Sequence, residues 1–202
     1  IRPLAWYGEG SFGLDVGSHP QHLMVATSST NVHLGGNRPR VSVSRWRRNP
    51  ATSLPALKLC GAYVNSILAK REVKARGFDE AMFADDDGFA VECTGANLFI
   101  VRDGRVTAVE HRDALPGITR DTLIRLIGAE SRMVSMEELR DADEVFACGT
   151  AAEVAPIAEI DDGSGDGRTY DPDSPVAREI AALYARTVRG ESAWSSGWLT
   201  EV

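Results

Sequence analysis

The chain has 202 residues, of which 43% are hydrophobic and 25% charged, and its formal net charge is −7. This is the composition of a globular protein that buries a real core. The acidic excess argues against a nucleic-acid partner held through phosphate contacts, and no apolar run approaches the roughly 20 residues that cross a bilayer. The three cysteines form no CxxC pair and the histidines have no metal-ligand spacing, so we expect a reduced, cytoplasmic protein without a metal site.

The first part of the chain is predicted to contain strands and one long helix. It starts at Ile1 rather than at Met, inside a strand-like run, so we expect a preceding N-terminal part to be missing. Residues 22–28 form a short apolar strand, and residues 40–46 alternate as in a half-buried strand. A long helix follows and ends near Gly77. Apolar residues at helical spacing define its expected buried face, namely Leu57, Cys60, Gly61, Val64, Ile67 and Leu68.

The rest of the chain mixes short strands with separate helices. Strands at 80–84 and 89–92, and at 97–101 and 105–109, are joined by Asp-Gly turns, which are strong hairpin signals. The later elements are predicted as helices at 119–128, 135–141 and 175–189, strands at 144–148 and 154–160, and a turn at 163–167. Ser135 and Glu138 form a capping-box pattern. These elements indicate an α+β architecture.

Lys58 is the first candidate for chemistry. It is one of three lysines, and no charged residue lies within nine positions on either side of it. An amine among apolar groups loses its proton more easily, and a neutral amine can form a Schiff base with a carbonyl. The alternative is a lysine that extends into solvent from the start of a helix.

Glu92 and two small-residue loops are the other candidates. Glu92 ends an apolar strand, either as an ordinary surface carboxylate or as a group aimed at a ligand, and Asn97 after it is explained equally well by local backbone bonding. In the loop 115–120, Thr119 either caps a helix or belongs to an anion cradle. The turn 148–152 presents backbone amides that could also bind an anion.

A Schiff-base lysine, a strand-end glutamate and two anion cradles together meet the requirements of pyridoxal phosphate. The order of the motifs resembles the class IV (fold type IV) pyridoxal-phosphate aminotransferases, most closely the branched-chain amino acid aminotransferases. The motifs are Lys58…Tyr63, Glu92-x-x-Gly95-x-Asn97-Leu98-Phe99, Leu115-Pro116-Gly117-Ile118-Thr119-Arg120-Asp121, Asp143-Glu144-Val145-Phe146 and Gly149-Thr150-Ala151-Ala152-Glu153.

The resemblance implies a role for each matching residue. Lys58 would bond covalently to the cofactor and move a proton between the substrate and the cofactor. Tyr63 would hydrogen-bond the phenolic oxygen of the cofactor, Glu92 would pair with its pyridinium nitrogen, and Leu115 would pack on its ring.

The resemblance also implies ligands for phosphate and for substrate. Thr150 and Ala151 would receive the substrate carboxylate, and Arg2 would recognise the side-chain carboxylate of glutamate. The residues that would bind the phosphate are Ile118, Thr119, Gly149 and Thr150.

The implied fold is α+β (α/β) of fold type IV, mainly its C-terminal pseudo-barrel domain. Residues 36–202 would form this cofactor-binding domain, and residues 1–35 the interdomain segment and the remainder of the N-terminal domain. The missing part would supply a phosphate-binding arginine, so we expect the chain alone to be a poor enzyme. We expect a homodimer or higher homo-oligomer, with an amino acid and a 2-oxo acid as its small-molecule substrates.

The leading prediction is transamination of a branched-chain or similar hydrophobic amino acid with 2-oxoglutarate. Ala96 stands where the family often has a glutamate, which leaves the substrate open. The alternatives are a lyase of the same fold (similar to aminodeoxychorismate lyase), a D-amino acid or (R)-amine transaminase, and a non-catalytic module. An arginine-rich stretch is interpreted as solvated surface or subunit contact rather than as a nucleic-acid patch; it comprises Arg38, Arg40, Arg45, Arg47 and Arg48.

Overall fold

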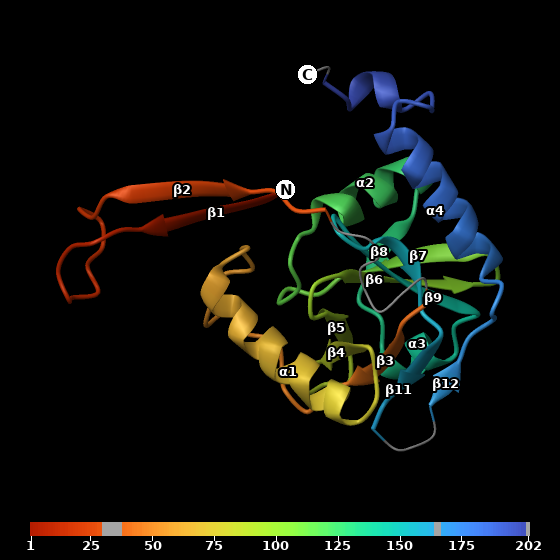
Figure 1. The fold of residues 1–202 in the computed structure, drawn as a ribbon. Helices are drawn as coiled ribbons and strands as arrows, with labels where there is room; N and C mark the ends of the chain where they lie inside the picture. Colours follow the sequence, from red (N-terminus) through yellow and green to blue (C-terminus); the bar gives the residue numbers. More distant parts are fainter. Residues whose placement is uncertain (30–37, 164–166, 201–202) are drawn as a thin grey trace. The chain divides into compact units, whose positions relative to one another are not determined.

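A computed structural model describes residues 1–29, 38–163 and 167–200. The chain divides into two units, Ile1–Asn31 and Val32–Val202, which are drawn in Figure 1 and described separately. The expected domain boundary between residues 35 and 36 lies outside the described residues. In the described part of the chain, no helix has the length and apolar character needed to span a membrane.

The first unit is a β-hairpin. Its strands β1 (Arg2–Tyr7) and β2 (Gln21–Ala26) are antiparallel, with Arg2 opposite Ala26 and Tyr7 opposite Gln21. The Trp6 and His22 rings stack across the pair with their centroids 5.5 Å apart. Both strands predicted for this region are therefore confirmed.

The second unit contains two five-stranded sheets, ordered β10-β9-β6-β7-β8 and β12-β11-β3-β4-β5 (Figure 1). The first sheet is built from β6 (Asn97–Arg102), β7 (Arg105–Val109), β8 (Glu130–Arg132), β9 (Glu144–Gly149) and β10 (Glu153–Pro156). The second is built from β3 (Arg40–Val43), β4 (Glu80–Ala84), β5 (Ala90–Cys93), β11 (Glu159–Asp161) and β12 (Arg168–Thr169). The helices are α1 (Tyr63–Ala75), α2 (Ile118–Ile127), α3 (Met136–Arg140) and α4 (Pro175–Val188), with 3-10 turns at Cys60–Ala62 and Ser195–Gly197.

Strand β6 shows how the layers are held together. Leu98 and Ile100 point into a core shared by the two sheets, whereas Phe99 and Val101 point to the opposite face, into a core shared with α2 and α4. Phe99 stacks on its register partner Phe146 with the ring centroids 4.9 Å apart. Because both faces are covered, this strand is a continuous apolar run rather than an alternating one.

Local turn and cap signals are largely confirmed. The turn Asp103-Gly104 joins β6 to β7, and both residues have positive φ (49° and 72°), as a two-residue hairpin turn requires. The Ser135 hydroxyl accepts a hydrogen bond from the Glu138 amide at 3.0 Å and so begins α3. The Glu138 carboxylate does not complete the capping box, because it pairs with Arg132.

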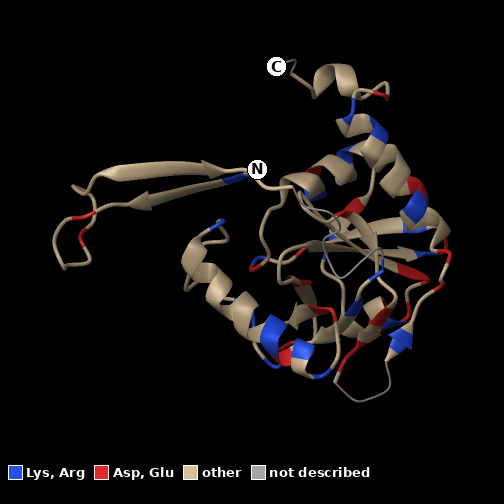
Figure 2. Cartoon of the chain, in the orientation of Figure 1, with Lys and Arg blue, Asp and Glu red and all other residues tan. Residues whose placement is uncertain are grey.

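The prediction for the long helix is wrong in two respects. The α-helix begins only at Tyr63, so Lys58 lies in a loop before it. Its predicted apolar face is also wrong, because Val64 and Ile67 are 55% and 57% exposed. The side that packs towards the sheet is made of small residues that allow close approach, and its buried members are Ser66, Ala69 and Val73. The charged residues gather in the second half of the helix (Figure 2).

The predicted single strand 154–160 is also wrong. It divides into β10 and β11, which belong to different sheets, because the chain crosses from one sheet to the other after Pro156. The run stays apolar because it is buried on both sides of the crossing. Two short strands, β8 and β12, were not predicted, and the turn 163–167 lies partly outside the described residues. In α4, Thr187 is buried while the apolar Val188 is 38% exposed.

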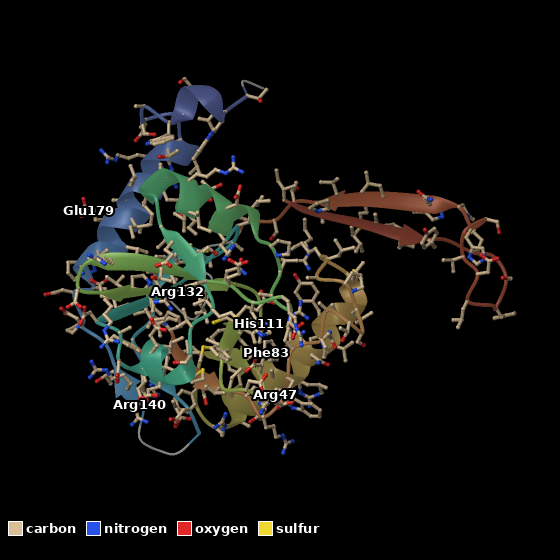
Figure 3. All side chains as sticks on the ribbon, turned by 180° about the vertical axis from the view of Figure 1, so that it is seen from behind. Arg47, Phe83, His111, Arg132, Arg140 and Glu179 are labelled. Carbon is tan, nitrogen blue, oxygen red and sulfur yellow. The ribbon has the colours of Figure 1, made fainter. Side chains whose placement is uncertain are left out.

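Asp85 anchors the turn between β4 and β5. Its Oδ1 accepts hydrogen bonds from the amides of Asp87 and Phe89 at 3.0 and 2.7 Å. Its Oδ2 lies 3.1 Å from Nε2 of His111, which lies in the interior of the unit (Figure 3). Burial alone would raise the pKa of Asp85, but the hydrogen bonds from Phe89 and His111 outweigh it and lower the pKa.

Asp85→Asn is therefore expected to lower the free energy of unfolding by about 1–3 kcal/mol near pH 7. Since folding lowers this pKa, the ionised carboxylate stabilises the fold above the ordinary carboxyl value of about 4, and the effect disappears as pH falls through the folded value. Urea unfolding near pH 7 and near pH 3 should show the difference between variant and parent shrinking in acid. Asp87→Asn, exposed in the same turn, is the control, and an equal loss in both variants would contradict the assignment.

Candidate active site

Glu92 is the centre of the candidate site. It lies on β5, and its side chain is 7% exposed. The alternative that Glu92 is an ordinary surface carboxylate is therefore wrong. Its Oε1 accepts a hydrogen bond from Nε of Arg48 at 2.6 Å. Its Oε2 accepts from the Leu115 amide at 3.0 Å and from Nδ2 of Asn97 at 3.2 Å. Residues from three separate parts of the chain thus meet at one carboxylate.

The charge state of Glu92 is set by opposing effects. Burial raises its pKa above the ordinary carboxyl value. The Arg48 guanidinium, the Leu115 amide and the charge of Lys58 act in the opposite direction, in that order of importance. A buried carboxylate held in this way is suited to face a cation in a dry site.

Lys58 and Tyr63 form the second feature of the site. The Lys58 amine donates a hydrogen bond to the Tyr63 phenol at 3.0 Å. The side chain of Lys58 is exposed, so the described residues do not form the apolar surroundings expected from its sequence neighbours. The reason is that Leu57 and Leu59 are themselves exposed and leave the amine uncovered. The structure therefore presents an amine and a phenol side by side to solvent.

The first predicted anion cradle lies at the start of α2. Gly117 is the N-cap residue and no side chain caps the helix, so the alternative that Thr119 is the cap is wrong. Thr119 is the second residue of the helix and is buried, whereas Ile118, the first, is 76% exposed. The first turn of a helix carries backbone N–H groups without intrahelical partners, and these groups favour anions.

The second predicted cradle follows β9. Gly149 ends the strand, and Thr150 and Ala151 are exposed in the turn after it. A Cβ on Gly149 would lie 3.3 Å from the carbonyl oxygen of Gly95, so this strand end lies against the turn that follows Glu92. The second cradle therefore adjoins the turn that follows Glu92.

Asn97 connects Glu92 to the first cradle, a role that its local sequence did not reveal. Its Nδ2 donates to both Glu92 Oε2 and the Leu115 carbonyl, the latter at 2.8 Å. Its Oδ1 leaves no room for a side chain on Gly117, since a Cβ atom on Gly117 would lie 2.2 Å from this oxygen. The apposition explains why the N-cap of α2 is a glycine, although its φ of −71° is open to any residue.

Gly117→Ala is expected to weaken binding of pyridoxal phosphate to the full-length protein by about tenfold or more. The methyl group would displace a buried Asn97 that holds two hydrogen bonds, each worth about 1 kcal/mol, and about 1.4 kcal/mol corresponds to a tenfold change. Absorbance titration of the cofactor-free protein measures the affinity. Gly95→Ala is the matched control, because nothing lies within 4 Å of a Cβ at that position. Unchanged affinity in Gly117→Ala would contradict this account.

One site candidate belongs to the first unit, and the environment of one arginine differs from the prediction. Arg2 lies on β1 of the first unit. Arg48 was expected to be part of a solvated arginine-rich surface, but its side chain is only 10% exposed. No local pattern distinguishes it from Arg47, because both follow β3 in the same polar run.

An amine beside a phenol, a buried carboxylate and two groups of backbone amides form the donor set of a pyridoxal-phosphate enzyme. The family model for "Amino-transferase class IV" matches residues 1–160. The chain belongs to this family, and the resemblance seen in the motifs is confirmed.

Relatives and solved structures agree with this assignment. The chain is 40% identical, over its whole length and 67% of the relative, to a probable branched-chain-amino-acid aminotransferase of Aquifex aeolicus. It is similar to the branched-chain aminotransferase of Thermoproteus uzoniensis with norvaline (TM-score 0.88, 36% identity, 98% of this chain and 67% of that one). It is also similar to the branched-chain amino acid aminotransferase of Thermobaculum terrenum in its PLP-form (TM-score 0.85, 32% identity, 98% and 66%). The α+β fold of fold type IV is thereby confirmed.

Proposed function

We propose that the protein transfers the amino group of a branched-chain or similar hydrophobic amino acid to 2-oxoglutarate, with pyridoxal 5'-phosphate as its cofactor. The observation that carries the proposal is the joint presence of the Lys58–Tyr63 pair and the buried, multiply bonded Glu92. The substrate class is supported by the relatives, which are named as branched-chain-amino-acid aminotransferases.

The donor set fits this cofactor group by group. Glu92 is a buried carboxyl group suited to pair with a cationic ring nitrogen. The α2 N-terminus and the turn after β9 offer backbone amides suited to phosphate. Pyridoxal phosphate, when bound, withdraws electrons from the substrate Cα so that its proton can leave.

Each residue of the chain then has a defined task. We assign to Lys58 the covalent attachment of the cofactor and the transfer of a proton at the substrate Cα. Tyr63 positions the amine and hydrogen-bonds the phenolic oxygen, and Leu115 packs on the ring face. The phosphate is assigned to Ile118, Thr119, Gly149 and Thr150, and substrate carboxylates to Thr150, Ala151 and Arg2.

We also propose a homodimer located in the cytoplasm, with residues 36–202 as the cofactor-binding domain. Apolar side chains on and just before α1 are exposed in the second unit, and they would be covered by a second copy of the chain. They are Leu57, Leu59, Val64 and Ile67.

The test is an assay of the full-length protein with pyridoxal phosphate, a branched-chain amino acid and 2-oxoglutarate. The expected result is one glutamate formed for each 2-oxo acid derived from the donor. Product formation that does not depend on 2-oxoglutarate would favour the lyase alternative, and the absence of any reaction with hydrophobic donors would overturn the proposed substrate class.

A further inference from the structure

Arg48 is a buried cation with no role so far. Its Nε lies 2.6 Å from Oε1 of Glu92, and the two side chains are 10% and 7% exposed. Its neighbour Arg47, labelled in Figure 3, is 46% exposed and pairs with the exposed Asp86. Two adjacent arginines thus make ion pairs in opposite environments, one in the interior and one in water.

Arg48 also contacts the backbone that leads into α1. Its Nη1 donates to the Ala62 carbonyl at 3.4 Å, and the Asn49 side chain donates to the same oxygen at 3.1 Å. Ala62 immediately precedes Tyr63, whose phenol holds the Lys58 amine. One guanidinium therefore joins the carboxylate of Glu92 to the segment that carries the amine and the phenol.

The charge of Arg48 has a chemical consequence at Glu92. A carboxyl group in a dry site tends to keep its proton, and a neutral carboxyl cannot balance a cationic ring nitrogen. Asn97 and the Leu115 amide bond the other oxygen, but neither carries a charge. The other titratable groups that interact with this carboxyl are Lys58, which is exposed, and the buried thiol of Cys93. Arg48 is therefore the one buried positive charge that these contacts supply among the described residues.

We propose that Arg48 is a positioning residue, which keeps Glu92 ionised and in place before the cofactor arrives. The inference rests on the proposed role of Glu92 towards the ring nitrogen. A guanidinium suits this task because its fork reaches two acceptors at once, whereas a lysine would supply a point charge only.

The first test is the pKa of Glu92 in the cofactor-free, full-length protein, measured by carbon-13 NMR of the glutamate carboxyls and assigned with Glu92→Gln. Arg48→Met is expected to raise this pKa by about 1 to 3, while Arg47→Met leaves it unchanged. Arg48→Lys, which restores the charge, is expected to return the pKa towards the parental value. An unchanged pKa in Arg48→Met would overturn the inference.

A second measurement applies even if Arg48→Met alone fails to fold. The double variant Arg48→Met/Glu92→Gln removes both buried charges and leaves neither unpaired. If Arg48 acts through Glu92, this double variant has the same kcat as Glu92→Gln alone. A further tenfold loss in the double variant would overturn the inference. The proposed role of Glu92 is tested separately. It is wrong if Glu92→Gln keeps parental activity, even when Arg48→Met still raises the pKa of Glu92.

Discussion

Lys58→Ala in the full-length protein is expected to reduce transamination by at least about a thousandfold, the scale of losing a positioned proton-transfer group. The amine is the group that we assign to both covalent attachment and proton transfer at the substrate Cα, and a methyl group can do neither. The exposed position of Lys58, 3.0 Å from the Tyr63 phenol, makes it accessible to a carbonyl. Turnover of a branched-chain amino acid with 2-oxoglutarate measures the effect.

Lys74→Ala is the control for this prediction, because Lys74 is an exposed lysine in the last turn of α1. It should keep parental turnover. Borohydride reduction of the cofactor-loaded protein, followed by peptide mapping, should place the label on Lys58. A label on Lys70 or Lys74 would contradict the assignment of Lys58 as the residue that binds the cofactor covalently.

Glu92→Gln is expected to lower kcat by about a hundredfold to a thousandfold, which corresponds to about 3–4 kcal/mol of barrier. A neutral amide cannot balance the charge of a protonated ring nitrogen, so the electron-withdrawing power of the ring falls. The contacts assigned to phosphate and ring face lie on other residues, so cofactor content should fall far less than turnover. Steady-state kinetics and bound-cofactor absorbance distinguish the two effects.

The same variant leaves the Arg48 guanidinium buried without its partner, and an uncompensated buried charge costs about 3–5 kcal/mol of stability. Unfolding measurements should therefore accompany the kinetics. Glu137→Gln, an exposed carboxylate on α3, serves as the control and should change neither quantity. Near-parental turnover in Glu92→Gln would show that Glu92 is a structural carboxylate only.

The sequence alone was sufficient to predict those features that are encoded by a few neighbouring residues. Asp-Gly turns identified two hairpins because few residues adopt positive φ without strain, and Gly104 and Gly88 do so here. The motifs around Lys58, Glu92 and Thr119 identified the family, since several motifs in a defined order are much more specific than any one of them.

Only the tertiary structure decided which groups are buried and which meet. Arg47 and Arg48 have the same side chain and are adjacent in the chain, yet one is solvated and the other is paired with Glu92. The helix α1 buries its small residues instead of Val64 and Ile67, because the sheet beneath it determines which stripe fits. Glu92 and Leu115 are 23 residues apart and meet at 3.0 Å. Burial and charge pairing depend on contacts between distant segments, and no pattern within one segment records them.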